Sequence, residues 1–82
     1  MAANKSEAEI YIDWAKDYQD SARYIKEKIE KLKSKAEIAQ GSELLELQDK
    51  IRIMNESYTD CIGIAKILEA HALRAAAREK RR

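Results

Sequence analysis

The residues that most often carry out catalysis or hold metal ions are few and poorly spaced in this sequence. His71 is the only histidine and Cys61 the only cysteine among the 82 residues, which excludes an intrachain disulfide and argues against a four-ligand zinc site. Glu69 lies two residues before His71, and helical residues at that spacing do not share a face. The Glu-x-x-His pattern of di-iron bundles would need a glutamate where the chain has Leu68. We therefore expect a protein that is not an enzyme and that uses no cofactor or metal ion.

One cluster of charged residues could bind phosphate groups. It lies at the C-terminal end of the chain and consists of Arg74, Arg78, Lys80, Arg81 and Arg82. Such clusters attract nucleic acids because binding releases the counterions condensed on the phosphate backbone. Two observations weigh against this interpretation: the formal net charge is only +1, and the helix dipole by itself favours cations at a helix C-terminus. Nucleic-acid binding is therefore the alternative prediction.

The spacing of apolar residues predicts two long helices that would carry these side chains. Apolar residues recur at alternating steps of three and four, as in the heptad seam of a coiled coil. In the second half of the chain the predicted seam is unbroken: Leu44, Leu47, Ile51, Met54, Tyr58, Cys61, Ala65, Leu68, Ala72 and Ala75. In the first half it is Tyr11, Trp14, Tyr18, Ala22, Ile25, Ile29, Leu32, Ala36 and Ala39. The step of four from Tyr18 to Ala22, where three is due, predicts a local unwinding of the supercoil.

Local signals predict where each helix begins and ends. Ser6 followed by Glu9 matches a capping box, in which the hydroxyl and the carboxylate each accept a hydrogen bond from a backbone N–H. Gly41 suits the left-handed position that ends many helices, and Ser42 suits the N-cap of the next helix. We expect a single domain over 1–82, with a helix over about 6–39, a turn at 40–42, a helix over about 43–78 and a basic tail at 79–82. A polar cluster near residues 55–60 leaves an alternative with three helices.

A turn of this length favours an antiparallel hairpin, and the distribution of charge agrees. Residues 1–22 carry two bases and five acids, 23–35 six bases and two acids, 36–60 two bases and six acids, and 61–82 six bases and two acids. Folding back at Gly41 places blocks of opposite sign side by side, whereas a parallel arrangement would place like signs together. In this register Tyr11 lies opposite Ala72. The predicted fold is all-α: an antiparallel, coiled-coil-like two-helix hairpin.

A second set of apolar and aromatic residues predicts self-association. A lone hairpin buries one narrow seam, so surplus apolar side chains would stay in water. The surplus residues are Ile10, Ile12, Trp14, Ile53, Ile62, Ile64, Ile67, His71 and Leu73. Since most of them gather toward the open end, we expect a homodimer that forms a four-helix bundle. The leading functional prediction is a non-enzymatic helical interaction module, a small homo-oligomeric scaffold or regulator that binds another protein.

In architecture alone, this plan resembles the Rop-like hairpin dimers that modulate RNA, and the nucleic-acid alternative would take that form. The plan also resembles type VII-secreted helical hairpins, although the corner reads Gln40-Gly41-Ser42 where those proteins have a Trp-x-Gly turn. Charged side chains interrupt the most apolar stretch, so no membrane span is expected. Residues 1–20 lack the apolar core of a signal peptide, and the expected compartment is the cytoplasm.

Overall fold

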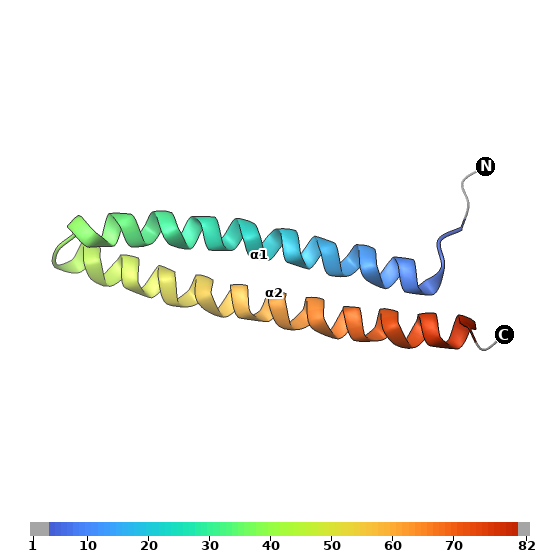
Figure 1. The fold of residues 1–82 in the computed structure, drawn as a ribbon. Helices are drawn as coiled ribbons and strands as arrows, with labels where there is room; N and C mark the ends of the chain where they lie inside the picture. Colours follow the sequence, from blue (N-terminus) through green and yellow to red (C-terminus); the bar gives the residue numbers. More distant parts are fainter. Residues whose placement is uncertain (1–3, 81–82) are drawn as a thin grey trace.

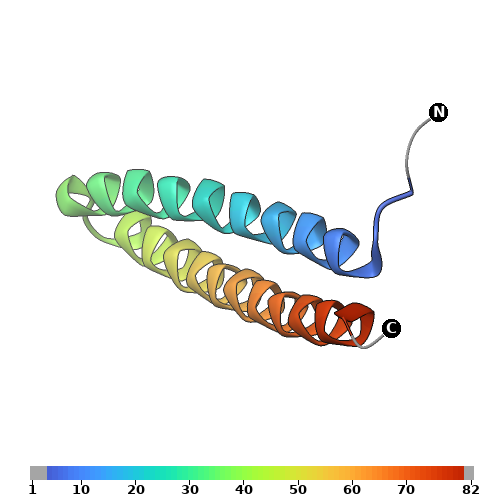
Figure 2. The same ribbon diagram turned by 45° about the vertical axis from the view of Figure 1, so that its right-hand side comes forward.

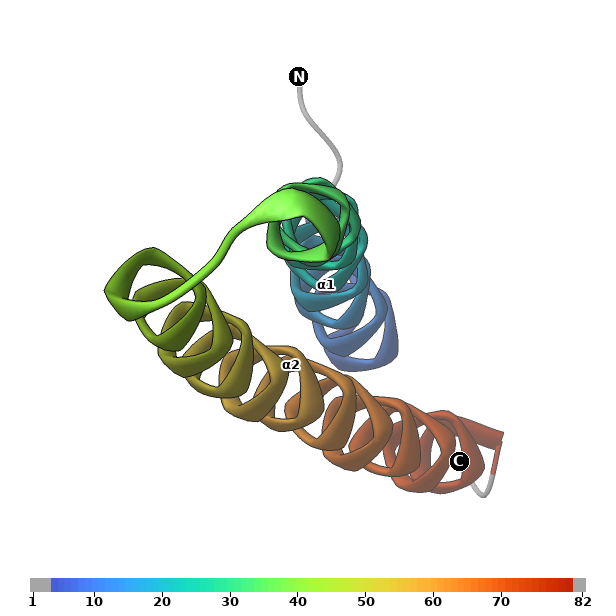
Figure 3. The same cartoon turned by 90° about the vertical axis from the view of Figure 1, so that its left-hand side faces the viewer.

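The protein folds into an antiparallel hairpin of two long helices, as the sequence predicts. A computed structural model describes residues 4–80, in which α1 spans Glu7–Ile38 and α2 spans Ser42–Lys80 (Figure 1). Turning the molecule shows the helices side by side along their length (Figure 2), and the end-on view shows that they cross at an angle (Figure 3). The hairpin measures 63 × 26 × 12 Å. Within residues 4–80, neither helix is long and apolar enough to cross a membrane.

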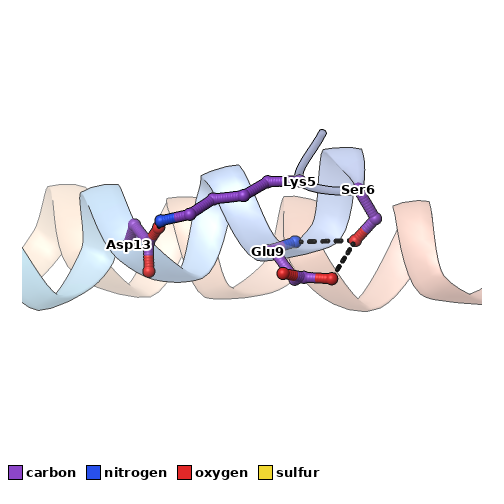
Figure 4. A network of polar contacts seen from close by, with 4 residues as sticks. All are labelled: Lys5, Ser6, Glu9 and Asp13. Atoms are coloured by element: carbon purple, nitrogen blue, oxygen red, sulfur yellow. Dashed lines mark hydrogen bonds and ion pairs between the residues drawn. The ribbon is translucent and has the colours of Figure 1, made fainter. Parts of the chain in front are cut away.

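Helix α1 begins at the predicted cap, with one difference in its hydrogen bonds. Ser6 is the N-cap, and its Oγ accepts a hydrogen bond from the Glu9 backbone N–H at 3.2 Å (Figure 4). The Glu9 carboxylate accepts from the Ser6 hydroxyl at 3.2 Å, where a capping box would have it accept from the Ser6 backbone N–H. Lys5 forms an ion pair with Asp13 across the first two turns, and this hydrogen bond lowers the pKa of the Asp13 carboxyl. The acidic first turns of α1 are thus fixed by a short local network.

The turn depends on the backbone conformation of one glycine. Gly41 has φ of +63°, the left-handed region that glycine adopts without steric cost. Its carbonyl accepts a hydrogen bond from the Leu45 N–H at 3.2 Å, so Gly41 takes the N-cap position of α2. The prediction that Ser42 is the N-cap is therefore wrong by one residue: Ser42 is the first residue of the helix.

Helix α2 is continuous through the polar cluster near residues 55–60, so the three-helix alternative is wrong. The Thr59 hydroxyl donates to the Asn55 carbonyl at 3.0 Å, which satisfies it within the helix. Gly63 lies inside the helix, and a Cβ built on it would meet no atom within 4 Å. The regular seam spacing therefore outweighs the weak local turn signals in this segment.

The seam forms as predicted in α2 but differs in the first half of α1. All ten predicted seam residues of α2 are buried or half-buried. In α1, Ala15 is 2% exposed, whereas Trp14 is 52% exposed, so the prediction that Trp14 lies in the seam is wrong. The predicted unwinding disappears with it, because Ala8, Tyr11, Ala15, Tyr18 and Ala22 follow one another at regular steps of three and four. Tyr18 keeps this spacing but is 38% exposed, so it lies at the edge of the seam and is not buried as predicted.

The buried core is thin because alanines make most of it. The buried side chains are Ala8, Ala15, Ala22, Ile29, Leu47, Ala65, Ala72 and Ala75. Among the described residues, no large side chain is fully buried. Small residues let the two backbones approach closely, but they remove little apolar area from water. The hairpin therefore exposes 6643 Å², against about 5000 Å² for a compact monomer of this mass.

Candidate interaction surface

The aromatic residues at the open end gather on one face of the hairpin. The rings of Tyr11 and Trp14 meet edge to face with centroids 5.9 Å apart, and Tyr11 stacks on His71 with centroids 5.4 Å apart. This contact agrees with the predicted register to within one residue, since Tyr11 was expected opposite Ala72. A shallow hollow of about 290 Å³ crosses from α1 to α2 beside these rings, lined by Trp14, Asp17, Tyr18, Ile64 and Leu68. Trp14 and Ile64 are thus brought together from opposite ends of the sequence.

Two more exposed isoleucines extend this surface along the helices. Ile10 precedes Trp14 by four residues, and Ile67 follows Ile64 by three, so each shares a helix face with its neighbour. Ile67 is 59% exposed. The sequence-predicted residues Ile10, Trp14, Ile64, Ile67 and His71 therefore form one continuous apolar and aromatic surface at the open end.

A groove of about 370 Å³ lies toward the closed end on the same face. Three apolar side chains, Leu32, Ile53 and Met54, line this groove together with four lysines, Lys28, Lys31, Lys35 and Lys50. Lys28 and Lys35 follow Trp14 by two and three heptads, and Ile67 follows Ile53 by two. Residues separated by whole heptads lie on the same side of a helical hairpin. We call the surface that contains both the hollow and this groove the tryptophan face.

The remaining predicted interface residues lie on the opposite side. Ile12 and Leu73 line a separate hollow of about 320 Å³ with Ala8, Glu69, Ala72 and Ala76. Ile62 is half-buried and precedes Glu69 by one heptad, which places it on that side too. There the Gln19 amide donates to the Glu69 carboxylate at 2.6 Å. The nine predicted residues were expected to form one surface, but they divide between two faces, six on the tryptophan face and three opposite.

The C-terminal basic cluster is partly engaged within the hairpin. Arg78 forms an ion pair with Glu7 at 3.0 Å, which joins the end of α2 to the start of α1. Arg74 and Lys80 are exposed. Arg81 and Arg82 lie outside the residues that the structure describes. Because Arg78 has an intramolecular partner, this cluster offers fewer free cations to a phosphate backbone than the sequence suggests.

The side chains capable of chemistry do not converge. Cys61 is half-buried in the seam, and His71 stacks on Tyr11. Within residues 4–80, no three histidine, cysteine or acidic side chains are grouped to hold a metal ion. The two further groups whose pKa is displaced, Lys5 and Arg52, are surface cations whose pKa is raised by hydrogen bonds from Lys5 to Asp13 and from Arg52 to Asp49. The tryptophan face is the more extensive of the two exposed apolar surfaces that the described residues form.

Sequence reasoning missed the four lysines around the groove as a local feature. In the sequence the four lysines fall in two different blocks of charge, three in 23–35 and Lys50 in 36–60, and no local pattern joins them. The signal was present, because Lys28 and Lys35 fall on the heptad position of Trp14, and Lys50 falls on that of Ile64.

No protein-family model matches this chain, and no curated protein or solved structure matches it either.

Proposed function

We propose that this chain is a non-enzymatic interaction module that pairs with a second copy through the tryptophan face and serves as a small scaffold or regulator for another protein. A dimer of hairpins packed in this way is a four-helix bundle. The observation that carries the proposal is the exposure of Trp14, Ile53, Ile64 and Ile67 on one side of a hairpin whose core is mostly alanine.

The energetics support pairing. Full burial of a side chain of this size contributes about 1.5–3 kcal/mol. The four side chains are already about half-buried in the hairpin, so covering them in both copies amounts to roughly four full side chains, which offsets much of the entropy lost on association. Each hairpin exposes roughly 1600 Å² more than a compact chain of its mass would, or about 3200 Å² for two copies. A standard protein interface buries about 1200–2000 Å² summed over both partners, and homodimer interfaces run to about 2000–5000 Å². The surplus surface of two copies therefore exceeds a standard interface and falls within the range of homodimer interfaces.

Light scattering after gel filtration at micromolar concentration tests the proposal. The parent chain should elute as a dimer. Ile64→Asp combined with Ile67→Asp should elute as a monomer with unchanged helical circular dichroism, because desolvating two unpaired carboxylates opposes association. A matched control is Leu45→Asp with Leu73→Asp, since these leucines are exposed away from the tryptophan face. A monomeric parent, or an assembled Ile64/Ile67 variant, would overturn the proposal.

The partner protein would meet the face that such a dimer leaves open. Ile12 and Leu73 remain exposed there around their own hollow. Mass spectrometry of proteins that co-purify from the native cell with the parent chain, but not with Ile12→Asp/Leu73→Asp, would identify the partner. Co-purification that is equal for both chains would place the partner elsewhere.

One observation favours a second function, nucleic-acid binding. Lys28, Lys31, Lys35 and Lys50 surround one groove, and Arg74 lies one heptad beyond Ile67 on the same side. A stripe of cations on one face is the electrostatic footprint of a nucleic-acid-binding protein. A salt titration of binding to random RNA and DNA would test it: a steep loss of affinity with salt would support this function, and no binding at low salt would exclude it.

A further inference from the structure

We infer that the lysine-rimmed groove receives the Trp14 end of a second copy, so that the two hairpins lie with their turns at opposite ends. This inference rests on the proposed function, because it specifies how the tryptophan faces meet. The occupant of the groove is thus the partner copy, and the contact is repeated twice across one two-fold axis.

Only two symmetric arrangements place one tryptophan face on another with all neighbouring helices antiparallel. If the two-fold axis runs along the hairpin, both turns lie at the same end and α1 faces α2 of the partner copy. If the axis runs across the hairpin, the turns lie at opposite ends and α1 faces α1 of the partner copy. Apolar packing alone does not choose between them, because both cover the same residues.

The distribution of charge on the tryptophan face favours the arrangement with turns at opposite ends. With both turns at one end, the two grooves would meet, and Lys28, Lys31, Lys35 and Lys50 of each copy would crowd together. Like charges brought together in a partly dehydrated interface oppose association. With turns at opposite ends, each groove faces an open end instead, where Asp17 lines the hollow beside Trp14.

The spacing along α1 makes two favourable contacts coincide. Trp14 and Asp17 are three residues apart, and so are Lys28 and Lys31. An antiparallel pairing of α1 with its symmetry mate can therefore set Asp17 against Lys28 and Trp14 against Lys31 at the same time. The first contact is an ion pair, and the second places an ammonium group near an indole face. The apolar residues that line the groove, Leu32, Ile53 and Met54, then cover the apolar parts of the open end.

Crosslinking distinguishes the two arrangements. In a Cys61→Ala background, a bis-maleimide that spans roughly 10–12 Å, about one helix diameter, is added to two variants. The first is Asp17→Cys/Lys28→Cys, whose cysteines lie about 16 Å apart along one helix and so cannot be joined within a chain by this reagent. The second is Gln40→Cys, at the turn of a hairpin 63 Å long.

Covalent dimers of the 17/28 variant, with none of the Gln40 variant, would support the inference. Covalent dimers of the Gln40 variant alone would overturn it, because the turns would then lie together. A chain that is a dimer by light scattering but crosslinks in neither variant would also overturn it, while leaving the proposed function intact. A parent chain that is monomeric by light scattering would remove the proposed function itself.

Charge-reversal variants test the arrangement independently, because the two arrangements predict changes of opposite sign in the dissociation constant of the dimer. Lys28→Asp should raise the dissociation constant of the dimer about tenfold, since two symmetry-related contacts each change by about a factor of three. Asp17→Lys combined with Lys28→Asp should restore affinity toward the parent value. Lys33→Asp, which makes the same change of charge outside the groove, should have little effect. If the turns lay at one end, Lys28→Asp would tighten the dimer by relieving the crowding of lysines.

Discussion

Replacement of the two glycines by alanine should change the free energy of unfolding in opposite directions. Gly63 lies inside α2, and a Cβ there would meet nothing within 4 Å, so Gly63→Ala adds no steric conflict. Alanine restricts the unfolded chain more than glycine does, and the gain is about 0.5–1 kcal/mol in a helix interior. Gly41 also has open space around it, but its φ is +63°, a conformation that costs an L-residue roughly 1–2 kcal/mol. The restricted unfolded chain offsets part of this cost, as it does at Gly63, so the net effect of Gly41→Ala should be a loss of about 1 kcal/mol in the free energy of unfolding.

Urea unfolding followed by circular dichroism, at a fixed chain concentration because assembly couples to unfolding, measures both changes. A change of 1 kcal/mol corresponds to about 4–8 °C in melting temperature for a domain of this size. Gly41→Asn is the control for the turn, because asparagine tolerates the left-handed region and should lose less than alanine. A destabilised Gly63→Ala would refute the reasoning, since it would mean that α2 is broken near Gly63, as in the three-helix alternative.

Two further predictions concern the seam and the start of α1. Ile29→Ala should lower the free energy of unfolding by about 2–5 kcal/mol, because Ile29 is 3% exposed. Leu45→Ala should change it by less than about 0.5 kcal/mol, because Leu45 is 67% exposed and lies away from the tryptophan face. Equal effects of the two substitutions in urea unfolding would contradict the assigned seam. Lys5→Ala should raise the pKa of Asp13 toward its ordinary value, since the hydrogen bond from Lys5 is the main cause of its lowered pKa. In the parent chain, the lowered pKa of Asp13 means that this ion pair stabilises the fold at pH values above the ordinary pKa of an aspartate, and the contribution is lost as the pH falls through the lowered value. An NMR titration of the Asp13 side chain measures its pKa in the parent chain and in Lys5→Ala. The same pKa in both chains would contradict the prediction.

The sequence predicts most of the architecture because the signals that define it are local or periodic. Ser6 and Glu9 mark the start of α1, and Gly41 marks the turn, since each acts through its own backbone conformation or an adjacent hydrogen bond. The seam of α2 is readable because ten residues repeat one spacing, which outweighs the polar segment around Thr59. The charge blocks then select the antiparallel orientation without any knowledge of side-chain positions.

The sequence also determined that apolar side chains exceed what one seam can bury, but the tertiary structure alone decided where they lie. Trp14 and Ala15 are neighbours in the chain, and the sequence predicts that Trp14 lies in the seam because it is the larger apolar residue. In the structure the two helices approach so closely that only Ala15 fits between them, and Trp14 is exposed. The sequence groups Arg78 with the C-terminal basic cluster, but the register of the hairpin also brings it to Glu7, with which it forms an ion pair. The predicted interface divided into two faces, and four lysines came together around one groove. These outcomes depend on the rotation of each helix about its own axis and on contacts between residues dozens of positions apart, and such contacts exist only after the chain has folded back on itself.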